Sequence, residues 1–248
     1  MDLFGLSAIL IAPFAGSFVG VLIERLPAGR PIVLARSTCD ACGRALGPRD
    51  LVPIVSWLAQ RGRCRCCQAR LGIFYPAIEL AALAVAVWAA FVLSGWLVWA
   101  SALLGWCLLA LAAIDQRHEI LPDMLTLPLI PAGLLVAYLV DPAKLPNHLI
   151  GALSGYLAFI AIAWLYHRIR RREGLGAGDA KLMAAAGAWL GWQGLPSVVL
   201  IGAMAALLGA LIHARGGGRL DPTARIAFGP YLALGFWLVW LYGPLRFG

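Results

Sequence analysis

The sequence predicts an all-α polytopic membrane protein with about eight transmembrane helices and a small cytoplasmic zinc-binding insert between the first two helices. Of its 248 residues, 62% are hydrophobic and only 13% are charged, whereas soluble domains average about 25% charged residues. Several apolar runs approach the roughly 20 residues that cross about 30 Å of hydrocarbon. The charged residues gather between these runs, and five of the six cysteines lie in the first intervening segment.

Eight apolar stretches are predicted to be membrane helices. The first begins directly after Met1-Asp2, without preceding basic residues or a small-residue cleavage site, so we expect a retained helix and not a signal peptide. The sixth is short and rich in Ala and Gly, so hydropathy supports it least. The stretches are Leu3–Ile23, Ile73–Leu93, Trp96–Ile114, Leu121–Val140, Leu149–Tyr166, Ala180–Leu195, Ser197–His213 and Ala227–Tyr242.

Pairs of glycines four residues apart occur within or beside three of these stretches. Such pairs let helix backbones approach closely inside a membrane, so we expect helix contacts at these positions. The pairs are Gly16/Gly20, Gly151/Gly155 and Gly187/Gly191.

The basic residues predict the orientation in the membrane. With the N-terminus outside, only Lys144 and Arg246 of the 20 Lys and Arg fall on the outer side, as the positive-inside rule requires. Both termini are therefore expected outside. The net charge of +8 is explained by topology, so we expect the lipid bilayer as a partner and no nucleic acid.

The segment after the first helix is predicted to bind a metal. Cys39-Asp-Ala-Cys42 and Cys64-Arg-Cys-Cys67 form two CxxC pairs, the spacing of a four-cysteine zinc site. The cytoplasm disfavours disulfides, and a metal would stabilise a segment too short for its own core. We expect Cys39, Cys42, Cys64 and Cys67 to be the ligands. Redox or unligated thiols are the alternative, and Cys66 is either a spare thiol or a partner of Cys64.

Two aspartates stand out because they lie at ends of apolar helices on the predicted cytoplasmic side. Asp115 closes one helix, where the helix dipole disfavours a negative charge, and Asp179 begins another, where the dipole favours it. Environments that shift the pKa values of two carboxyl groups in opposite directions are typical of an acid–base pair. The alternative is two unrelated interfacial carboxylates.

Three other charged residues keep two interpretations each. Glu79 lies about one turn inside the second apolar stretch, where a charge is costly, so it is either the partner of an Arg or a site residue. Asp123 follows Pro122, a position typical of a helix cap, so it is either a cap or a site residue. Lys181 either acts on Asp179 or substrate, or anchors the helix at the interface.

Several segments resemble, in sequence order, the bacterial type IV prepilin peptidases (prepilin leader peptidase/N-methyltransferases), which are membrane aspartyl proteases of the GxGD type. Three positions, Gly20, Asp40 and Cys66, depart from the pattern of that family. The matching segments are Gly16 to Pro27, the CxxC pairs with Arg61-Gly-Arg-Cys64, Tyr75-Pro-Ala-Ile-Glu79, Ile114-Asp115 to Leu121-Pro-Asp123, Gly176-Ala-Gly-Asp-Ala-Lys181 and Phe228 to Gly235.

The resemblance implies that Asp115 and Asp179 are catalytic. It also implies cleavage of prepilins or pseudopilins of type IV pili or type II secretion at the cytoplasmic face of the bacterial inner membrane. The new N-terminus would then be methylated from S-adenosylmethionine, an activity that rests on the resemblance alone. On this basis we expect residues 1–23 to form the first membrane helix, 24–72 the methyltransferase-associated zinc insert and 73–248 the peptidase domain.

Two other classes of function remain open. A proton-coupled transporter would place its acids near the bilayer midplane and show repeat symmetry. A zinc-bearing assembly scaffold would need the cysteines but neither Asp115 nor Asp179. Loss of leader cleavage on substitution of either aspartate would separate the protease from both.

Overall fold

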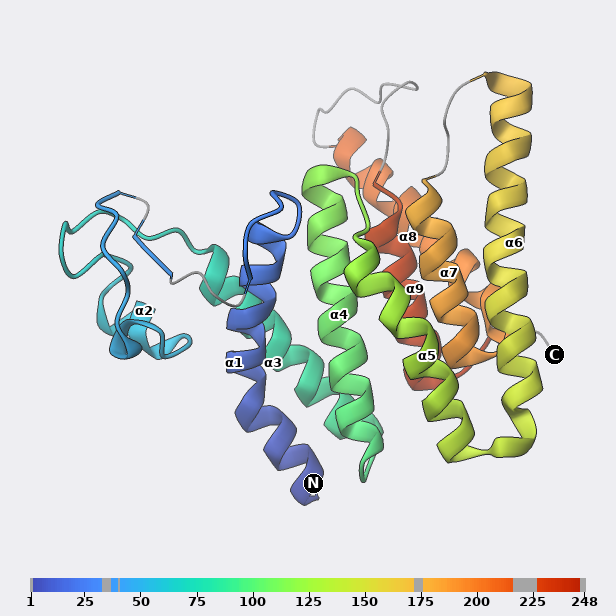
Figure 1. Ribbon diagram of the computed structural model, residues 1–248, viewed down its shortest axis with the longest axis horizontal. Coiled ribbons are helices and arrows are strands. Elements are labelled where there is room, and N and C mark those ends of the chain that lie inside the picture. The colour runs from blue at the N-terminus through green and yellow to red at the C-terminus, as the bar shows by residue number, and fades with distance from the viewer. Residues whose placement is uncertain (1, 33–36, 40, 172–175, 216–226, 246–248) are drawn as a thin grey trace. The chain divides into compact units, whose positions relative to one another are not determined.

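The structure, a computed structural model, describes residues 2–32, 37–39, 41–171, 176–215 and 227–245, and the described residues form helices and no strand (Figure 1). Two isolated β-bridges, Thr38 with Ala45 and Arg63 with Arg70, lie in the segment after the first helix. The helices are α1 (Leu3–Arg25), α2 (Val55–Ala59), α3 (Phe74–Val92), α4 (Leu97–His118), α5 (Asp123–Val140), α6 (Leu145–Arg170), α7 (Ala177–Leu190), α8 (Leu195–Arg215) and α9 (Gly229–Tyr242), with 3-10 turns η1 (Pro48–Asp50), η2 (Pro142–Lys144) and η3 (Trp192–Gly194).

Each of the eight predicted membrane helices has a counterpart among these helices. Within the described residues, six helices are long and apolar enough to cross a membrane, namely α1, α3, α4, α5, α6 and α8. Helices α7 and α9 have 14 residues each, which at about 1.5 Å per residue span about 21 Å. Among the residues named in the sequence analysis, Met1, Asp40 and Arg246 lie outside the described ranges.

The chain forms two compact units, Met1–Ala110 and Leu111–Gly248, and α4 runs from the first into the second. In the first unit α1 packs against α3. A side chain at Gly16 would come within 2.6 Å of the Glu79 Cα atom, so this glycine lets the two backbones touch. Trp106 Nε1 donates to the Ala82 carbonyl oxygen at 2.9 Å, which ties α4 to α3.

In the second unit α7 is the central helix and lies among α5, α6 and α9 (Figure 1). Ten of its residues are buried. The indole N–H of Trp189 donates to the Leu129 carbonyl oxygen at 2.8 Å. The helix ends at Gly191, whose φ of +74° a residue with a side chain rarely adopts. It therefore stops five residues before the end that hydropathy predicted at Leu195.

Helix α6 covers α7 on one side. A side chain at Gly151 would come within 2.6 Å of the Gly187 carbonyl oxygen, so glycine permits the contact between α6 and α7, as the glycine spacing predicted. The opposite face of α6 exposes large apolar side chains, as lipid contact requires. These are Leu149, Leu153, Leu157, Ile162 and Trp164.

The α6–α7 contact makes a testable prediction. Gly187→Val should lower the melting temperature of the purified protein in detergent, because overpacking typically costs about 1–3 kcal/mol. Ala161→Val, on the exposed side of α6, is the matched control and should change stability by no more than about 0.5 kcal/mol. An unchanged melting temperature for Gly187→Val would contradict the backbone contact.

Candidate active site and metal site

Asp179 lies in the first turn of α7. Its Oδ2 atom accepts a hydrogen bond from the main-chain N–H of Gly176 at 3.3 Å, and the residue is 7% exposed. Gly178 packs against Leu121 so closely that a Cβ atom would lie 2.8 Å from the Leu121 Cβ atom. The glycine thus lets the start of α7 lie directly against the segment that joins α4 to α5.

Asp115 lies in the last turn of α4 and is 6% exposed. Its Oδ2 atom accepts a hydrogen bond from the N–H of Gly229 at 3.0 Å. Gly229 is the first residue of α9, where main-chain N–H groups have no partner within the helix. The position predicted for Asp115, at a helix C-terminus, is correct, but the start of α9 adds a favourable donor that the order of the sequence does not reveal.

The structure brings Asp115 and Asp179 together within the second unit, near enough for their charges to repel each other. Both carboxyl groups are buried, and each accepts a main-chain N–H from the start of a helix. A negative charge near a second carboxyl group disfavours ionisation of that group. Two neighbouring carboxyl groups of this kind are the arrangement that acid–base chemistry needs.

Gly229 is a site residue that the sequence analysis did not single out. A Cβ atom at this position would lie 2.6 Å from Asp115 Oδ2, so only glycine permits the observed hydrogen bond without a shift. Its sequence signal is the Gly-Pro pair at the start of the last apolar stretch. Pro230 has no N–H of its own, which leaves the N–H of Gly229 as the donor at this point of α9.

Two charged residues beside the aspartates form an ion pair. Lys181, near the start of α7, pairs with the carboxylate of Asp123 at the start of α5. Pro122 is the N-cap of α5 and Asp123 is its first residue, so the carboxylate lies at the helix start and also pairs with Lys181. The pair links α5 to α7, and Lys181 is therefore committed to Asp123.

The four cysteines predicted as metal ligands lie together in the first unit. The Sγ atoms of Cys39, Cys42, Cys64 and Cys67 all lie within 4.8 Å of one another, and those of Cys39 and Cys67 are 3.9 Å apart. Four thiolates can surround one ion as a tetrahedral sulfur site requires. Cys66 is exposed and outside the cluster, as the CxxC spacing predicted.

The two CxxC loops have the same main-chain conformation. In each, the first cysteine N–H donates to a carbonyl five residues ahead, Arg44 or Ala69, at 2.9 Å. The residue four positions ahead, Gly43 or Gln68, has a positive φ. In the second loop, the N–H groups of Cys67 and Cys66 lower the pKa of the Cys64 thiol to about 6. Main-chain donors that favour a thiolate suit a metal ligand.

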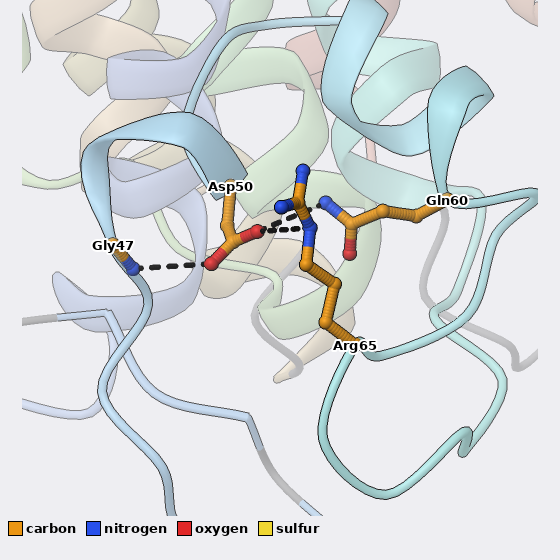
Figure 2. A network of polar contacts seen from close by, with 4 residues as sticks. All are labelled: Gly47, Asp50, Gln60 and Arg65. Atoms are coloured by element: carbon orange, nitrogen blue, oxygen red, sulfur yellow. Dashed lines mark hydrogen bonds and ion pairs between the residues drawn. The ribbon is translucent and has the colours of Figure 1, made fainter.

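The second CxxC loop is tied to the rest of the insert through Asp50 (Figure 2). The Asp50 carboxylate accepts from Gly47 N at 3.3 Å and Gln60 Nε2 at 3.2 Å, and pairs with Arg65 Nε at 3.0 Å. One carboxylate thereby joins η1, the end of α2 and the second CxxC loop. Such a polar network replaces part of the hydrophobic core that a short segment lacks.

Glu79 is a buried carboxylate with a main-chain partner. It is 5% exposed, and its Oε2 atom accepts from the N–H of Ile54 at 2.7 Å. Within the described part of the chain, no Lys or Arg forms an ion pair with it, so the first interpretation of this residue, an Arg partner, finds no support. The hydrogen bond holds Ile54, which has a φ of 61°, against α3.

Comparison with known proteins identifies the family. Residues 10–93 match the Bacterial Peptidase A24 N-terminal domain, and residues 102–212 match the Type IV leader peptidase family. A prepilin leader peptidase/N-methyltransferase of Burkholderia pseudomallei is 42% identical over 92% of this chain and 82% of its own length. Proteins of the same name from Pseudomonas aeruginosa and Aeromonas hydrophila are 36% and 38% identical, over 97% and 94% of this chain and 91% and 89% of their own lengths. No solved structure matches the chain. The chain therefore belongs to the type IV leader peptidase family.

Proposed function

We propose that this protein cleaves the leader peptide of type IV prepilins or pseudopilins with Asp115 and Asp179, and N-methylates the new N-terminal residue. The observation that carries the peptidase proposal is the pair of buried carboxyl groups, each held by a main-chain N–H at the start of a helix. The relatives named prepilin leader peptidase/N-methyltransferase support both activities.

In the proposed reaction the two carboxyl groups share the proton transfers of amide hydrolysis. One carboxylate, assigned to Asp179, takes a proton from a water molecule, and the oxygen of that water attacks the scissile carbonyl. The other, assigned to Asp115, is protonated and donates to the carbonyl oxygen or to the leaving amine. Lys181 lies two residues after Asp179 but pairs with Asp123, so no proton transfer is assigned to it.

The membrane arrangement of this proposal follows from the basic residues. The protein would lie in the bacterial inner membrane with both termini in the periplasm, and the two aspartates at the cytoplasmic face. A prepilin substrate, with a basic leader followed by a hydrophobic helix, would then present its scissile bond at this face. The exposed apolar side chains of α6 fit contact with lipid.

The four-cysteine cluster is proposed to hold a structural zinc ion through Cys39, Cys42, Cys64 and Cys67. Closed four-thiolate sites leave no open position for a substrate, so the metal stabilises the insert and takes no part in hydrolysis. Residues 24–72 are assigned to this methyltransferase-associated insert and residues 73–248 to the peptidase domain. S-adenosylmethionine is proposed as the methyl donor.

Replacement of either aspartate tests the peptidase. Asp115→Asn and Asp179→Asn should each reduce cleavage of a purified prepilin by at least about a hundredfold, because an amide cannot carry the proton. Product masses measured in detergent would report cleavage. Asp141→Asn, in an exposed ion pair with Lys144, is the matched control and should cleave like wild type. Full cleavage by Asp115→Asn or Asp179→Asn would exclude the proposed mechanism.

Gly229→Ala tests whether the start of α9 positions Asp115. The added methyl group would displace the carboxylate from its donor, and a displacement of about 1 Å at a reacting group can cost a hundredfold in rate. We expect kcat to fall by roughly tenfold or more, with KM little changed. Gly176→Ala is the control beside the other aspartate, since its Cβ atom would lie at an ordinary 3.6 Å from Asp179 Oδ2. Equal losses in the two variants would argue against positioning through Gly229.

The metal assignment is tested by metal content. Cys39→Ser and Cys64→Ser should lose the bound zinc and expose the insert to proteolysis, because the metal supplies its folding energy. Cys66→Ser and Cys107→Ser serve as controls, since both thiols lie outside the cluster. Plasma mass spectrometry of the purified protein would measure about one zinc per chain in wild type and in both controls. Retention of zinc by Cys39→Ser would contradict the proposed ligand set.

A further inference from the structure

A cavity of about 380 Å³ lies in the first unit between the insert, the C-terminal half of α1 and the start of α3. Its volume falls within the range of about 300–1,000 Å³ that small-molecule sites occupy. Three segments far apart in sequence supply its walls: Ser17 from α1, Trp57 from α2, and Tyr75 and Glu79 from α3. The two catalytic candidates belong to the other unit and do not line it.

The cavity is lined by a buried carboxylate that has no cationic partner within the described residues. The hydrogen bonds of Glu79 come from the N–H of Ile54 and from the side chain of Ser17, which are both neutral groups. A buried carboxylate is costly unless a charge or several donors compensate it. A cationic ligand in this cavity would supply the missing charge.

The cavity also contains a donor without an acceptor. The indole Nε1 of Trp57 is buried and makes no hydrogen bond to any described residue. Such groups are rare in folded proteins, and a bound ligand is one of the explanations. A ligand with an acceptor atom opposite the indole, such as a nucleoside base or ribose, would satisfy it.

The remaining walls suit the same ligand. Trp57, Phe74 and Tyr75 give the cavity three aromatic rings, which can stack on a nucleobase and attract a cation to their faces. Arg25 and Arg30 also line it and carry the charge that an amino-acid carboxylate prefers. A ligand with a cationic centre, a nucleoside and a carboxylate matches the cavity in all three respects.

We infer that this cavity is the site of the methyl donor S-adenosylmethionine, and that the Glu79 carboxylate faces its sulfonium group. The inference rests on the proposed N-methyltransferase activity and gives it a location. When bound, the sulfonium supplies a methyl group to the new N-terminal amine, which loses a proton to solvent, while the donor leaves as a neutral thioether. Cys39 lines the cavity as well as the metal cluster, so the zinc ion would keep one wall in place.

The test compares the charged donor with its neutral product, S-adenosylhomocysteine, which lacks the sulfonium. Dissociation constants of both would be measured by calorimetry on the purified full chain in detergent. Glu79→Gln keeps the size of the side chain and an acceptor for Ile54 but removes the charge. We expect it to weaken the donor by about tenfold or more and the product by less than about threefold. Asp141→Asn, which neutralises a carboxylate outside the cavity, is the control and should weaken neither.

A second variant keeps the inference testable if Glu79→Gln unfolds. Trp57→Phe retains an aromatic ring but removes the indole N–H, and it should weaken donor and product equally, by about threefold to tenfold. Unchanged affinities in both variants would overturn the assignment. Equal weakening of donor and product by Glu79→Gln would also overturn it, because a merely structural role does not distinguish the sulfonium.

Leader cleavage, measured on the same preparations, separates this inference from the proposed peptidase. Wild type that cleaves prepilin but binds neither donor nor product would overturn the cavity assignment and leave the peptidase intact. Wild type that binds the donor with the expected dependence on Glu79 but cleaves nothing would support the cavity and exclude the peptidase proposal.

Discussion

Buried carboxyl groups need partners inside the protein, because the surrounding lipid offers none. Asp115, Asp179 and Glu79 are all buried, and each accepts a main-chain N–H. For the two aspartates these donors come from the starts of α9 and α7, where N–H groups would otherwise lack acceptors. The main-chain N–H groups at these helix starts benefit as well, because the carboxyl groups accept their hydrogen bonds. The bond between Gly229 and Asp115 therefore links α9 to α4, whereas the bond between Gly176 and Asp179 fixes the carboxylate at the start of α7.

Short helices make this arrangement possible. Helices α7 and α9 have 14 residues each, which is too short to cross the hydrocarbon layer. Each therefore begins or ends at membrane depth, where polar main chain is tolerated only if the protein surrounds it. Glycine and alanine let α7 fit among its neighbours, because its backbone touches that of α6 at Gly151. That contact lies near the end of α7, while Gly178 packs the start of the helix, beside Asp179, against Leu121. A rigid backbone is what a pair of catalytic carboxyl groups needs.

The insert depends on a different physical device. It has few buried apolar side chains, and instead a cluster of four thiols and the Asp50 network join its loops. A metal ion in this cluster would hold Cys39 and, through it, one wall of the cavity beside Glu79. The two proposed activities would then occupy two separate units, each with its own source of stability.

Composition and spacing alone determined the helical class, the approximate position of every long helix and the grouping of four cysteines apart from Cys66. These features depend on local hydropathy, on steric limits within a CxxC loop and on the cost of charge in lipid, which a sequence reports directly. Only the tertiary structure decided which distant groups meet: Gly229 with Asp115, Lys181 with Asp123, and Ile54 with Glu79. The end of α7 at Gly191 was also decided by its packing and by a glycine conformation that hydropathy does not register. Contacts between residues 25 to 114 positions apart depend on how the helices pack, and one sequence carries no direct signal of that packing.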